Sequence, residues 1–561
     1  MLELAIMPNF CHRILPVLLL LCSCRMDIAL PNLPTAVYPI SPITPPPTPP
    51  VTPLVTTPLA TTPLPTLAPT ASPELFTLSA QTAVPPELQT TAQTIAANSP
   101  LFRWVDDPTA ADVVIAINEG TPLSRWLYVV AAPFATVADD IELEVVESGW
   151  ASGTTPLGSL YPTASGLGWT TVFGMPFHLS LPETDFSPVL WQNRPALTLL
   201  PFHQLVPDLK LLTINGRSPL DPNFDPASYP LQLTFGAMGR ETAVSQLQAL
   251  WPLPASNYDP QKMTRVALSG VTALVRATAY QMELNGILYP AQDVAPVFQA
   301  ADFAHVSNEV AFAPNCPPPN PVGGTSFCSS EAYFALLQAL GIDVIELTGN
   351  HLNDWGQENL LYTLDLYDKA GLQTFGGGRD LTDAAQPLRL DHHGNKIALT
   401  GCNPYGPVYA WATDSTPGAR PCDEAFLRQI SQLRDEGYLV LATQQYAEYY
   451  HYPPTPQQQA DFRRLIEAGA TAVSGSQGHH AQTFEFYNGG FNHYGLGNLF
   501  FDQMDMLGTR QTFIDTYVFY NGRLLTITLW TGLIENWAYP RQTTPAEREQ
   551  ALQTLFQVAG W

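Results

Sequence analysis

The sequence predicts an α/β fold for the C-terminal half of this 561-residue chain, with a mostly parallel sheet flanked by helices. Two observations carry this prediction. Apolar runs of strand length alternate with amphipathic segments of helical period from about residue 264 onward. Polar side chains gather where several of these runs end, which is where open α/β sheets bind ligands. The strand candidates are RVALSGVTALV (265–275), FAHVSNE (303–309), DVIELTGN (343–350), KIALTGCN (396–403), YLVLATQQY (438–446) and TAVSGSQ (471–477).

Helix boundaries are marked between these runs. Thr455 is expected to cap a helix that has Pro456 in its first turn, Gln458 in a capping-box position and Gly469 as its terminator. A second helix is expected to begin after Ser330 and to stop at Gly341. Each helix fills the interval between two strand candidates, as a parallel sheet requires.

A smaller accessory α/β domain is predicted for residues 100–255. Its strand-like runs are ADVVIAI (111–117), WLYVVAAPF (126–134), LTLLPFHQL (197–205) and LKLLTING (209–216). Stretches such as VVAAPF and SYPLQLTF faintly resemble one lobe of periplasmic solute-binding proteins. An accessory domain of unknown ligand is the alternative interpretation.

The N-terminus has the features of an export signal. Residues 14–21, ILPVLLLL, are too short to span a bilayer but suit the apolar core of a signal peptide. The tetrapeptide LCSC at 21–24 resembles a bacterial lipobox, which implies lipid attachment to Cys24. Plain secretion and an uncleaved anchor are the alternatives. Residues 25–99 are rich in Pro and Thr and are expected to form a disordered tether.

Charge excludes one class of partner. The formal net charge is -25 and the isoelectric point is near 4.6, whereas a nucleic-acid groove needs clustered Lys and Arg. We therefore expect no nucleic acid. Polyanionic partners are also repelled, unless a metal ion or a local basic pocket intervenes.

Four cysteines remain once the targeting region is set aside. Their spacing allows two local disulfide loops, although four cysteines permit three connectivities and free buried thiols are the alternative. The spacing does not match a zinc ribbon, so disulfides in an oxidising compartment are the better interpretation. The four residues are Cys316, Cys328, Cys402 and Cys422.

Candidate site residues lie at the ends of four strand candidates. The alternation of a strand puts His305, Ser307 and Glu309 on one face, and the structural alternative for Glu309 is a solvated strand end. The other ends carry Asn350 with His351, Gln444 and Gln445 with Glu448, and Gln477 with His479 and His480. Because parallel strands end at one edge of a sheet, these side chains are expected to surround a single cavity. Glu309, His351 and His479 in particular must then lie near one another.

The order of these segments resembles the poly-γ-glutamate capsule synthesis (CapA) family, which belongs to the calcineurin-like metallophosphatase superfamily. LTGNHLNDWG (347–356) matches the family's L-A-N-N-H-x-x-D-x-G, and YGLGNLFFD (494–502) its Y-S-L-G-N-F segment. QQYAE (444–448) takes the H-W-G-x-E position and GSQGH (475–479) the G-x-H-x-H position. The resemblance covers roughly residues 264–505 and implies a metallophosphatase-like layered α/β domain, for which we take the bounds 262–535, followed by a C-terminal helix at 536–561.

The superfamily normally holds two metal ions, and here the resemblance breaks down. Val271 stands where the first motif has Asp, and Gln444 and Gln477 stand where it has His. The ligands that the resemblance leaves are Glu309, Asn350 and His479. An intact di-metal centre is therefore not expected. One divalent ion (Mg²⁺, Ca²⁺ or Mn²⁺) and no metal at all both stay open. Substitute ligands or pocket residues are Gln444, Gln477, Glu448, Ser307 and Asn498.

The resemblance gives His351 the role of a general acid or transition-state stabiliser, oriented by Asp354. Asp354 is alternatively the N-cap of the next helix, three residues before Gln357. Asn350 is alternatively a strand-end hydrogen-bonding residue and His479 one of two surface histidines.

Two function classes follow. The first is an extracytoplasmic, lipid-anchored protein that takes part in the synthesis or anchoring of a capsule or cell-envelope polymer, with a degenerate metallophosphatase pocket. The second is an active metal-dependent hydrolase of phosphoester or amide-type bonds in such polymers. In both, the expected partners are the polymer and, through the lipid, the membrane of a bacterial cell.

Overall fold

A computed structural model describes residues 74–561. The predicted signal peptide, the lipobox with Cys24 and most of the predicted tether lie outside the described residues. The expectation that the tether reaches residue 99 is wrong, because β1 (Phe76–Ala80) and α1 (Pro86–Asn98) are folded. The composition of α1 is similar to that of a tether. However, Leu88, Ala92 and Ile95 recur at helical spacing and form a buried face.

The N-terminal region is built on one mixed sheet. Its strand order is β2-β1-β3-β10-β4-β8-β7-β6, and β9 joins β4 to β5. The long strand β4 pairs antiparallel with β10, β8 and β9, so it runs through the centre of the region. The remaining bounds are β2 Phe102–Trp104, β3 Val113–Ile117, β4 Thr121–Pro133, β5 Asp140–Ile141, β6 Thr154–Thr155, β7 Gly158–Pro162, β8 Ala196–Pro201, β9 Leu209–Ile214, β10 Gln232–Gly239, α2 Leu143–Ser152, α3 Thr170–Phe173, α4 Ser187–Gln192 and α5 Glu241–Leu250.

The C-terminal region contains two large sheets where the sequence pattern indicates one. The first has the order β17-β16-β13-β11-β27-β28-β29, with β12 bridging β13 and β26. Its strands are β11 Met263–Ser269, β12 Val271–Thr272, β13 Phe303–Asn308, β16 Val344–Glu346, β17 Gln373–Phe375, β26 Asn498–Phe500, β27 Gln511–Tyr520, β28 Arg523–Glu535 and β29 Tyr539–Gln542.

The second sheet has the order β19-β20-β22-β23-β25-β24. Strands β20, β22, β23 and β25 are parallel, and each sheet has antiparallel strands at an edge, so parallel pairing is confined to part of each sheet. The bounds are β19 Leu388–His392, β20 Asn395–Cys402, β22 Leu439–Gln445, β23 Ala472–Ser476, β24 Phe484–Tyr487 and β25 Gly490–His493, beside the short strands β14 Phe312–Ala313, β15 Ser329–Ser330, β18 Gly377–Gly378 and β21 Gly418–Ala419.

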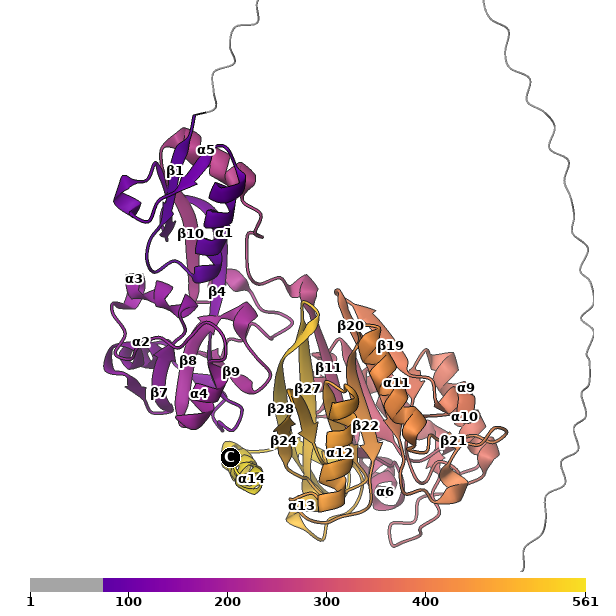
Figure 1. The fold of residues 1–561 in the computed structure, drawn as a ribbon. Coiled ribbons are helices and arrows are strands. Elements are labelled where there is room, and N and C mark those ends of the chain that lie inside the picture. The colour runs from indigo at the N-terminus through magenta and orange to yellow at the C-terminus, as the bar shows by residue number, and fades with distance from the viewer. Residues whose placement is uncertain (1–73) are drawn as a thin grey trace, which may run out of the picture. The chain divides into compact units, whose positions relative to one another are not determined.

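The two sheets face each other across a shared core, with helices outside. In β11, Val266 and Leu268 join the core that also takes Ile397 and Leu441 from the second sheet, whereas Ala267 points to the helical side. Figure 1 shows α11 and α12 alongside β20 and β22. The helices are α6 Arg276–Asn285, α7 Ala295–Gln299, α8 Phe334–Leu340, α9 Gln357–Ala370, α10 Leu381–Ala384, α11 Glu424–Asp435, α12 Pro456–Ala468, α13 Leu507–Arg510 and α14 Pro545–Ala559. This is the layered α/β fold that the sequence predicts.

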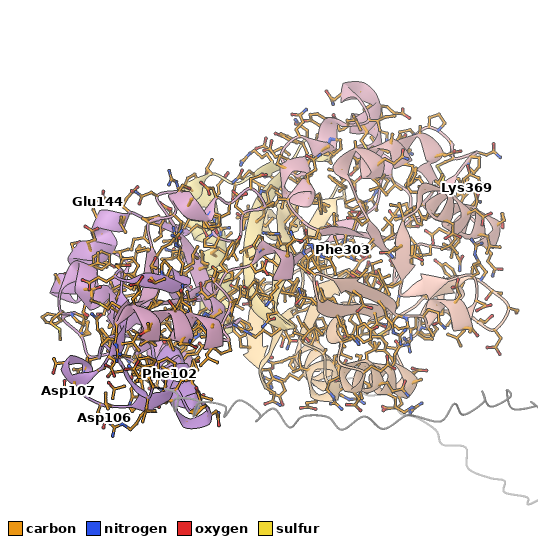
Figure 2. The ribbon with its side chains drawn as sticks, turned by 90° about the horizontal axis from the view of Figure 1, so that it is seen from above. Phe102, Asp106, Asp107, Glu144, Phe303 and Lys369 are labelled. Atoms are coloured by element: carbon orange, nitrogen blue, oxygen red, sulfur yellow. A yellow bond between two sulfur atoms is a disulfide. The ribbon has the colours of Figure 1, made fainter. Side chains whose placement is uncertain are left out.

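The predicted helix ends are confirmed, but the capping box is not completed, because the Gln458 side chain donates to Gln482 and to the backbone of Tyr494. The Thr455 side chain accepts a hydrogen bond from the Gln458 backbone N–H, and Gly469 closes α12 in the left-handed conformation. Helix α8 likewise ends at Gly341. In Figure 2, Lys369 near the end of α9 lies at the periphery of the region, whereas Phe303 at the start of β13 lies further inside.

The N-terminal and C-terminal regions share a core within the described part of the chain. Val518, Tyr520 and Leu525 of β27 and β28 belong to the same cluster of buried residues as the N-terminal sheet. Arg523 donates hydrogen bonds to the backbone oxygens of His203 and Leu205. Among the described residues, no helix has both the length and the apolar character needed to cross a membrane.

Candidate functional site

Four polar side chains from four strand ends meet in one buried cluster. Glu309 follows β13 directly, Asn350 follows β16 after a short turn, Gln445 is the last residue of β22 and Gln477 follows β23. The Nε2 atom of Gln445 lies 3.1 Å from Oε1 of Glu309, 3.0 Å from Oδ1 of Asn350 and 2.6 Å from Oε1 of Gln477. The sequence correctly predicts that these strand ends converge, because parallel strands of each sheet end at the same edge.

The short contact between the side-chain oxygens of Glu309 and Gln477 requires a hydrogen bond between these residues. The amide oxygen of Gln477 lies 2.6 Å from Oε1 of Glu309, a distance at which two oxygens repel unless a proton lies between them. Exchanging the oxygen and nitrogen of the Gln477 amide supplies an N–H. A proton on Glu309 supplies an O–H. Burial raises the pKa of Glu309 well above its ordinary value, and the negative charges of Glu448 and Glu346 act in the same direction. Burial therefore favours the neutral form of Glu309.

Gln444 lies outside this cluster, so the prediction that it takes a ligand position is wrong. Side chains alternate along β22, and Gln444 has the same parity as Val440 and Ala442, which pack toward the helical layer. Its Nε2 atom lies 3.6 Å from Sγ of Cys422. The neighbouring Gln445 points into the site instead.

His351 and Asp354 form a hydrogen-bonded pair. Nδ1 of His351 lies 2.6 Å from Oδ2 of Asp354, and that oxygen also accepts the backbone N–H of Phe327 at 3.0 Å. Oδ1 of Asp354 accepts from the Tyr409 hydroxyl at 3.2 Å. Asp354 does not cap α9, whose N-cap is Gly356. The alternative interpretation of Asp354 as an N-cap is therefore wrong. Because Nδ1 donates to Asp354, the lone pair of neutral His351 is on Nε2.

His479 is held by Asn498. The Asn498 amide nitrogen donates to the backbone oxygens of His479 and Thr509, so its oxygen accepts from Nδ1 of His479 at 2.7 Å. This fixes the lone pair of the ring on Nε2, which lies 3.9 Å from Oε1 of Glu448. Burial lowers the pKa of His479 to about 4, and the positive charges of His351 and Arg276 add to this effect. His479 is buried, so its interpretation as a surface histidine is wrong.

Arg276 is a site residue that sequence reasoning misses. Its Nε and Nη2 atoms bind the carboxylate of Asp502, and its guanidinium lies 5.2 Å from the ring centre of Phe327 and 4.6 Å from that of Phe501. Phe327 in turn contacts His351 and Phe501 stacks on His479. Two phenyl rings therefore connect the guanidinium to both histidines. Composition does not indicate a site role for Arg276, because it is a single basic residue in the apolar run VTALVRATA.

The remaining predicted residues lie nearby. Ser307 is buried on β13 beside Val271 of β12, and its hydroxyl has no partner among the described residues. His305, two positions earlier, has Nε2 3.2 Å from Oε2 of Glu346, at an angle that makes no hydrogen bond. Val271 is fully buried between β13 and β26 and offers no donor atom where the resemblance expects a carboxylate. The Tyr450 hydroxyl donates to Glu448 at 2.8 Å, and half of the Glu448 side chain is exposed.

The side chains do not fit the two-metal centre of the superfamily. Glu309 is the one carboxylate of the buried cluster, and the other three members are neutral amides. The amide nitrogen of Gln445 donates to Glu309, and that of Gln477 does so when its amide oxygen and nitrogen are exchanged. No hydrogen bond or ion pair joins His479 to Glu309 or Asn350 in the described region, where no group of three His, Cys, Asp or Glu is arranged to hold a metal ion. The ligand set of Glu309, Asn350 and His479 stays a prediction, and we derive no chemical step from a metal.

The four cysteines of the C-terminal region pair locally. Cys316 bonds to Cys328 and Cys402 to Cys422. The first loop leads directly into Phe327, which contacts both Asp354 and His351, and the second lies against Gln444. Both disulfides therefore support the edge of the sheets that carries the site.

Comparison with known proteins identifies the C-terminal region. Residues 265–503 match the family model described as "Bacterial capsule synthesis protein PGA_cap". This region is a CapA-family domain. The capsule biosynthesis protein CapA of Bacillus anthracis is 30% identical over 168 residues, which cover 29% of this chain and 41% of that protein. The PGA biosynthesis protein CapA of Bacillus subtilis (strain 168) is 27% identical over 216 residues, covering 38% and 56%. The chain thus spans about half the length of the curated CapA relatives it matches.

Solved structures show weaker similarity. A 5'-nucleotidase precursor from Thermus thermophilus aligns with 53% of this chain and 59% of its own, at a TM-score of 0.32 and 12% identity. A phosphate ABC transporter substrate-binding protein from Clostridium perfringens aligns with 31% and 91%, at a TM-score of 0.24 and 10% identity. The layered architecture of the CapA-family domain is therefore described from its own strands and helices.

Proposed function

We propose that this protein takes part in the synthesis or anchoring of an acidic capsule polymer of the poly-γ-glutamate type at the outer face of a bacterial membrane. The CapA-family domain supports the process, since its relatives carry the names of capsule and PGA biosynthesis proteins. The observation that carries the proposal is the replacement of a metal-ligand set by a neutral amide and acid cluster beside an intact His351–Asp354 pair. Such a pocket binds and orients a polymer more readily than it activates water through metal ions.

The chemistry available without metal is proton handling. His351 presents Nε2 as a base or, once protonated, as an acid, with Asp354 fixing the ring. His479 is neutral at physiological pH and presents a second lone pair toward Glu448. These groups can hold the polar backbone of a polymer by hydrogen bonds and can stabilise charge that develops on one of its amide groups.

Binding to the full-length protein tests the proposal. We expect poly-γ-glutamate to bind in isothermal titration calorimetry, and a neutral polysaccharide such as dextran not to bind. His351→Ala is expected to weaken the binding of poly-γ-glutamate, because it removes a hydrogen-bonding group from the pocket. Preference for the polysaccharide would move the proposal to a different polymer, and binding of neither would contradict it.

The metal content of the purified protein distinguishes polymer binding without metal from metal-dependent hydrolysis. We expect less than stoichiometric divalent metal in the purified protein by mass spectrometry. We expect metal binding to appear only in the combined variant Val271→Asp, Gln445→His and Gln477→His. A matched variant with Gln444→His in place of Gln445→His should not gain metal, because residue 444 points away from the cluster.

The second candidate function is hydrolysis of amide-type or phosphoester bonds, which the short contact between His351 and Asp354 favours. Its test is turnover of γ-glutamyl and phosphodiester substrates, with and without added Mg²⁺, Ca²⁺ or Mn²⁺. Turnover that is lost in His351→Ala and requires the metal would establish the hydrolase in place of the binding function.

The outer-face location belongs to the same proposal. It is supported by the lipobox-like LCSC and by the pairing of all four cysteines of the CapA-family domain. We expect Cys24→Ser to move the protein from the membrane fraction to the soluble fraction, with Cys22→Ser as the matched control. Membrane association unchanged in Cys24→Ser would contradict lipid anchoring at this residue.

A further inference from the structure

A small cavity opens beside the His351–Asp354 pair and has no assigned role. Its volume is about 120 Å³. Its lining includes Pro317, Pro318, Pro319 and Phe327 of the Cys316–Cys328 loop together with Arg276 and Trp355. Trp355 is 38% exposed, so the cavity has an aromatic residue at its mouth. Its walls combine apolar and polar surface, with one guanidinium among the polar groups.

Arg276 is held in place with part of its hydrogen-bonding capacity unused. Asp502 takes the edge formed by Nε and Nη2, whereas Nη1 has no hydrogen-bond partner among the described residues. The side chain is 23% exposed. Phe327 and Phe501 contact the guanidinium and restrict its plane. A guanidinium fixed in this way binds a second carboxylate with little loss of side-chain entropy.

The strained backbone conformation of residue 276 indicates that its Arg side chain is needed. Arg276 has a φ angle of 47°, in the left-handed region that costs a non-glycine residue of order 1 kcal/mol. Glycine would remove that strain. The Asp502 carboxylate also accepts the backbone N–H of Ala277, so the same residue holds both the strained turn and the guanidinium.

The net charge of the protein makes such a local cation important. At -25 the chain repels acidic polymers in general, and a carboxylate can approach only where a positive group is presented. The neighbouring carboxylates of Asp502, Asp354 and Glu448 disfavour a phosphate dianion more than a single carboxylate. The prolines and Trp355 suit the methylene groups of an acyl chain.

We propose that Arg276, the Cys316–Cys328 loop and Trp355 form a subsite that binds one carboxylate of an acidic acyl polymer and delivers the adjoining amide to His351. This inference deepens the proposed function and rests on it. Arg276 is then a specificity-determining residue, which selects a carboxylate-bearing unit over a neutral one.

The test compares two matched ligands on the full-length protein. One is a hexamer of γ-linked glutamate and the other a hexamer of γ-linked isoglutamine, which has the same length but carries amides in place of the free α-carboxylates. We expect the acidic hexamer to bind at least about 10-fold more tightly, in line with charge-assisted hydrogen bonds. We also expect its affinity to fall as NaCl is raised, whereas that of the amide hexamer should change little.

Three variants locate the effect. The pair Arg276→Gln with Asp502→Asn removes both charges together and is expected to weaken acidic-hexamer binding about 10- to 100-fold. Arg276→Lys keeps the charge and the Asp502 partner but loses the planar second edge of the guanidinium, so its affinity for the acidic hexamer should fall about 10-fold. This variant tests the subsite by itself if the double variant fails to fold. Arg379→Gln, on the surface and paired with Asp365 and Asp368, should bind like the unmodified protein.

The outcomes are distinct. Unchanged acidic-hexamer affinity in Arg276→Lys and the double variant would overturn the subsite and leave the proposed function standing. Equal affinity of the unmodified protein for both hexamers would also overturn it. If the unmodified protein binds neither hexamer, the proposed function and the subsite both fail. Inorganic phosphate competing as well as glutarate would show that the site selects phosphate and not carboxylate.

Discussion

At the residue scale, backbone strain is concentrated at the site. Gln477 and His479 have φ angles of 69° and 51°, in the left-handed region where Arg276 also lies. Such residues persist where the surrounding structure holds them, and here Gln445, Asn498 and Asp502 supply the holding contacts. The turn after β23 can therefore direct Gln477 and His479 to different contacts of the site although only Gly478 separates them.

The lowered pKa of His479 predicts a dependence of stability on pH. The folded pKa is about 4 and the unfolded value about 6.5, so the unfolded chain binds more protons between these limits. The stabilisation from neutral His479 is complete above pH 6.5 and is lost as the pH falls toward 4. We expect about 3 kcal/mol of the unfolding free energy to disappear across this window.

Chemical denaturation at several pH values measures this effect. His479→Gln should flatten the dependence between pH 4 and 6.5, and His451→Gln, which replaces an exposed histidine, should leave it unchanged. A pH dependence that is identical in His479→Gln and the unmodified protein would show that His479 does not titrate as proposed.

Asp354 has a larger structural role than an N-cap. It accepts hydrogen bonds from His351, Phe327 and Tyr409, and its side chain is 2% exposed. We expect Asp354→Ala to lower the free energy of unfolding by about 2–3 kcal/mol, since it leaves buried donors without a partner. Asp423→Ala removes the cap of α11 and should cost about 1 kcal/mol in the same urea titration. Equal losses in the two variants would contradict the difference in their roles.

Sequence reasoning identifies most of the site residues but not all of them. The motif positions of Glu309, Asn350, His351, Asp354 and His479 do lie at the converging strand ends. Gln445 is predicted at the converging strand end, but the motif position is assigned to Gln444, because alignment takes the first Gln of the pair whereas strand parity decides which one faces the site. The phase of β22 is readable from Val440 and Ala442, which share the helical face with Gln444.

At the element scale, the Cys316–Cys328 loop positions the catalytic candidate. Its last residues donate to Asp354 from the Phe327 N–H and from the Ser326 hydroxyl to the Asp354 backbone oxygen. Phe327 also contacts His351 and Arg276. The loop therefore links the dyad to the guanidinium, and loosening it should affect both.

Hydrogen exchange tests this coupling. We expect Cys316→Ser with Cys328→Ser to increase exchange at the Phe327 amide and in the 350–356 segment, because the loop loses a closure that contributes about 3 kcal/mol. The matched pair Cys402→Ser with Cys422→Ser should leave the Phe327 amide protected, since the loop that this disulfide closes bonds to Asn353 and Asp354 through Tyr409 and Pro417. Unchanged exchange in the first variant would show that the hydrogen bonds alone hold the loop.

At the scale of the whole molecule, the described regions are expected to unfold together. Val518, Tyr520 and Leu525 of the CapA-family domain are buried in the core of the N-terminal region, and Arg523 bonds to His203 and Leu205. Neither region can lose its structure without exposing apolar surface of the other. We expect a single transition in calorimetry of the full-length protein.

A matched pair of variants sharpens this prediction. Arg523→Ala should lower the melting temperature by several degrees, whereas Arg389→Ala, which removes an exposed ion pair with Glu436, should change it little. Two separated transitions in the unmodified protein would show that the regions are independent.

The sequence predicts the fold class but not how the strands are divided between sheets. Alternating strands and helices, with caps such as Thr455 and terminators such as Gly469, indicate the class correctly. The division into two facing sheets cannot be read from periodicity, because β11 and β20 are both buried on two sides and have no polar face. Residues 76–98 are assigned to the tether because composition outweighs the spacing of Leu88, Ala92 and Ile95.

The short sequence separation of the Cys316–Cys328 bond has a consequence for assembly order. Its two ends are 12 residues apart, so this covalent link can close before the more C-terminal part of the chain has folded. Asn498 and Asp502, which hold His479 and Arg276, come roughly 180 positions later. The Cys316–Cys328 loop can thus form early, whereas the contacts that hold His479 and Arg276 form only when the segment that contains Asn498 and Asp502 is in place.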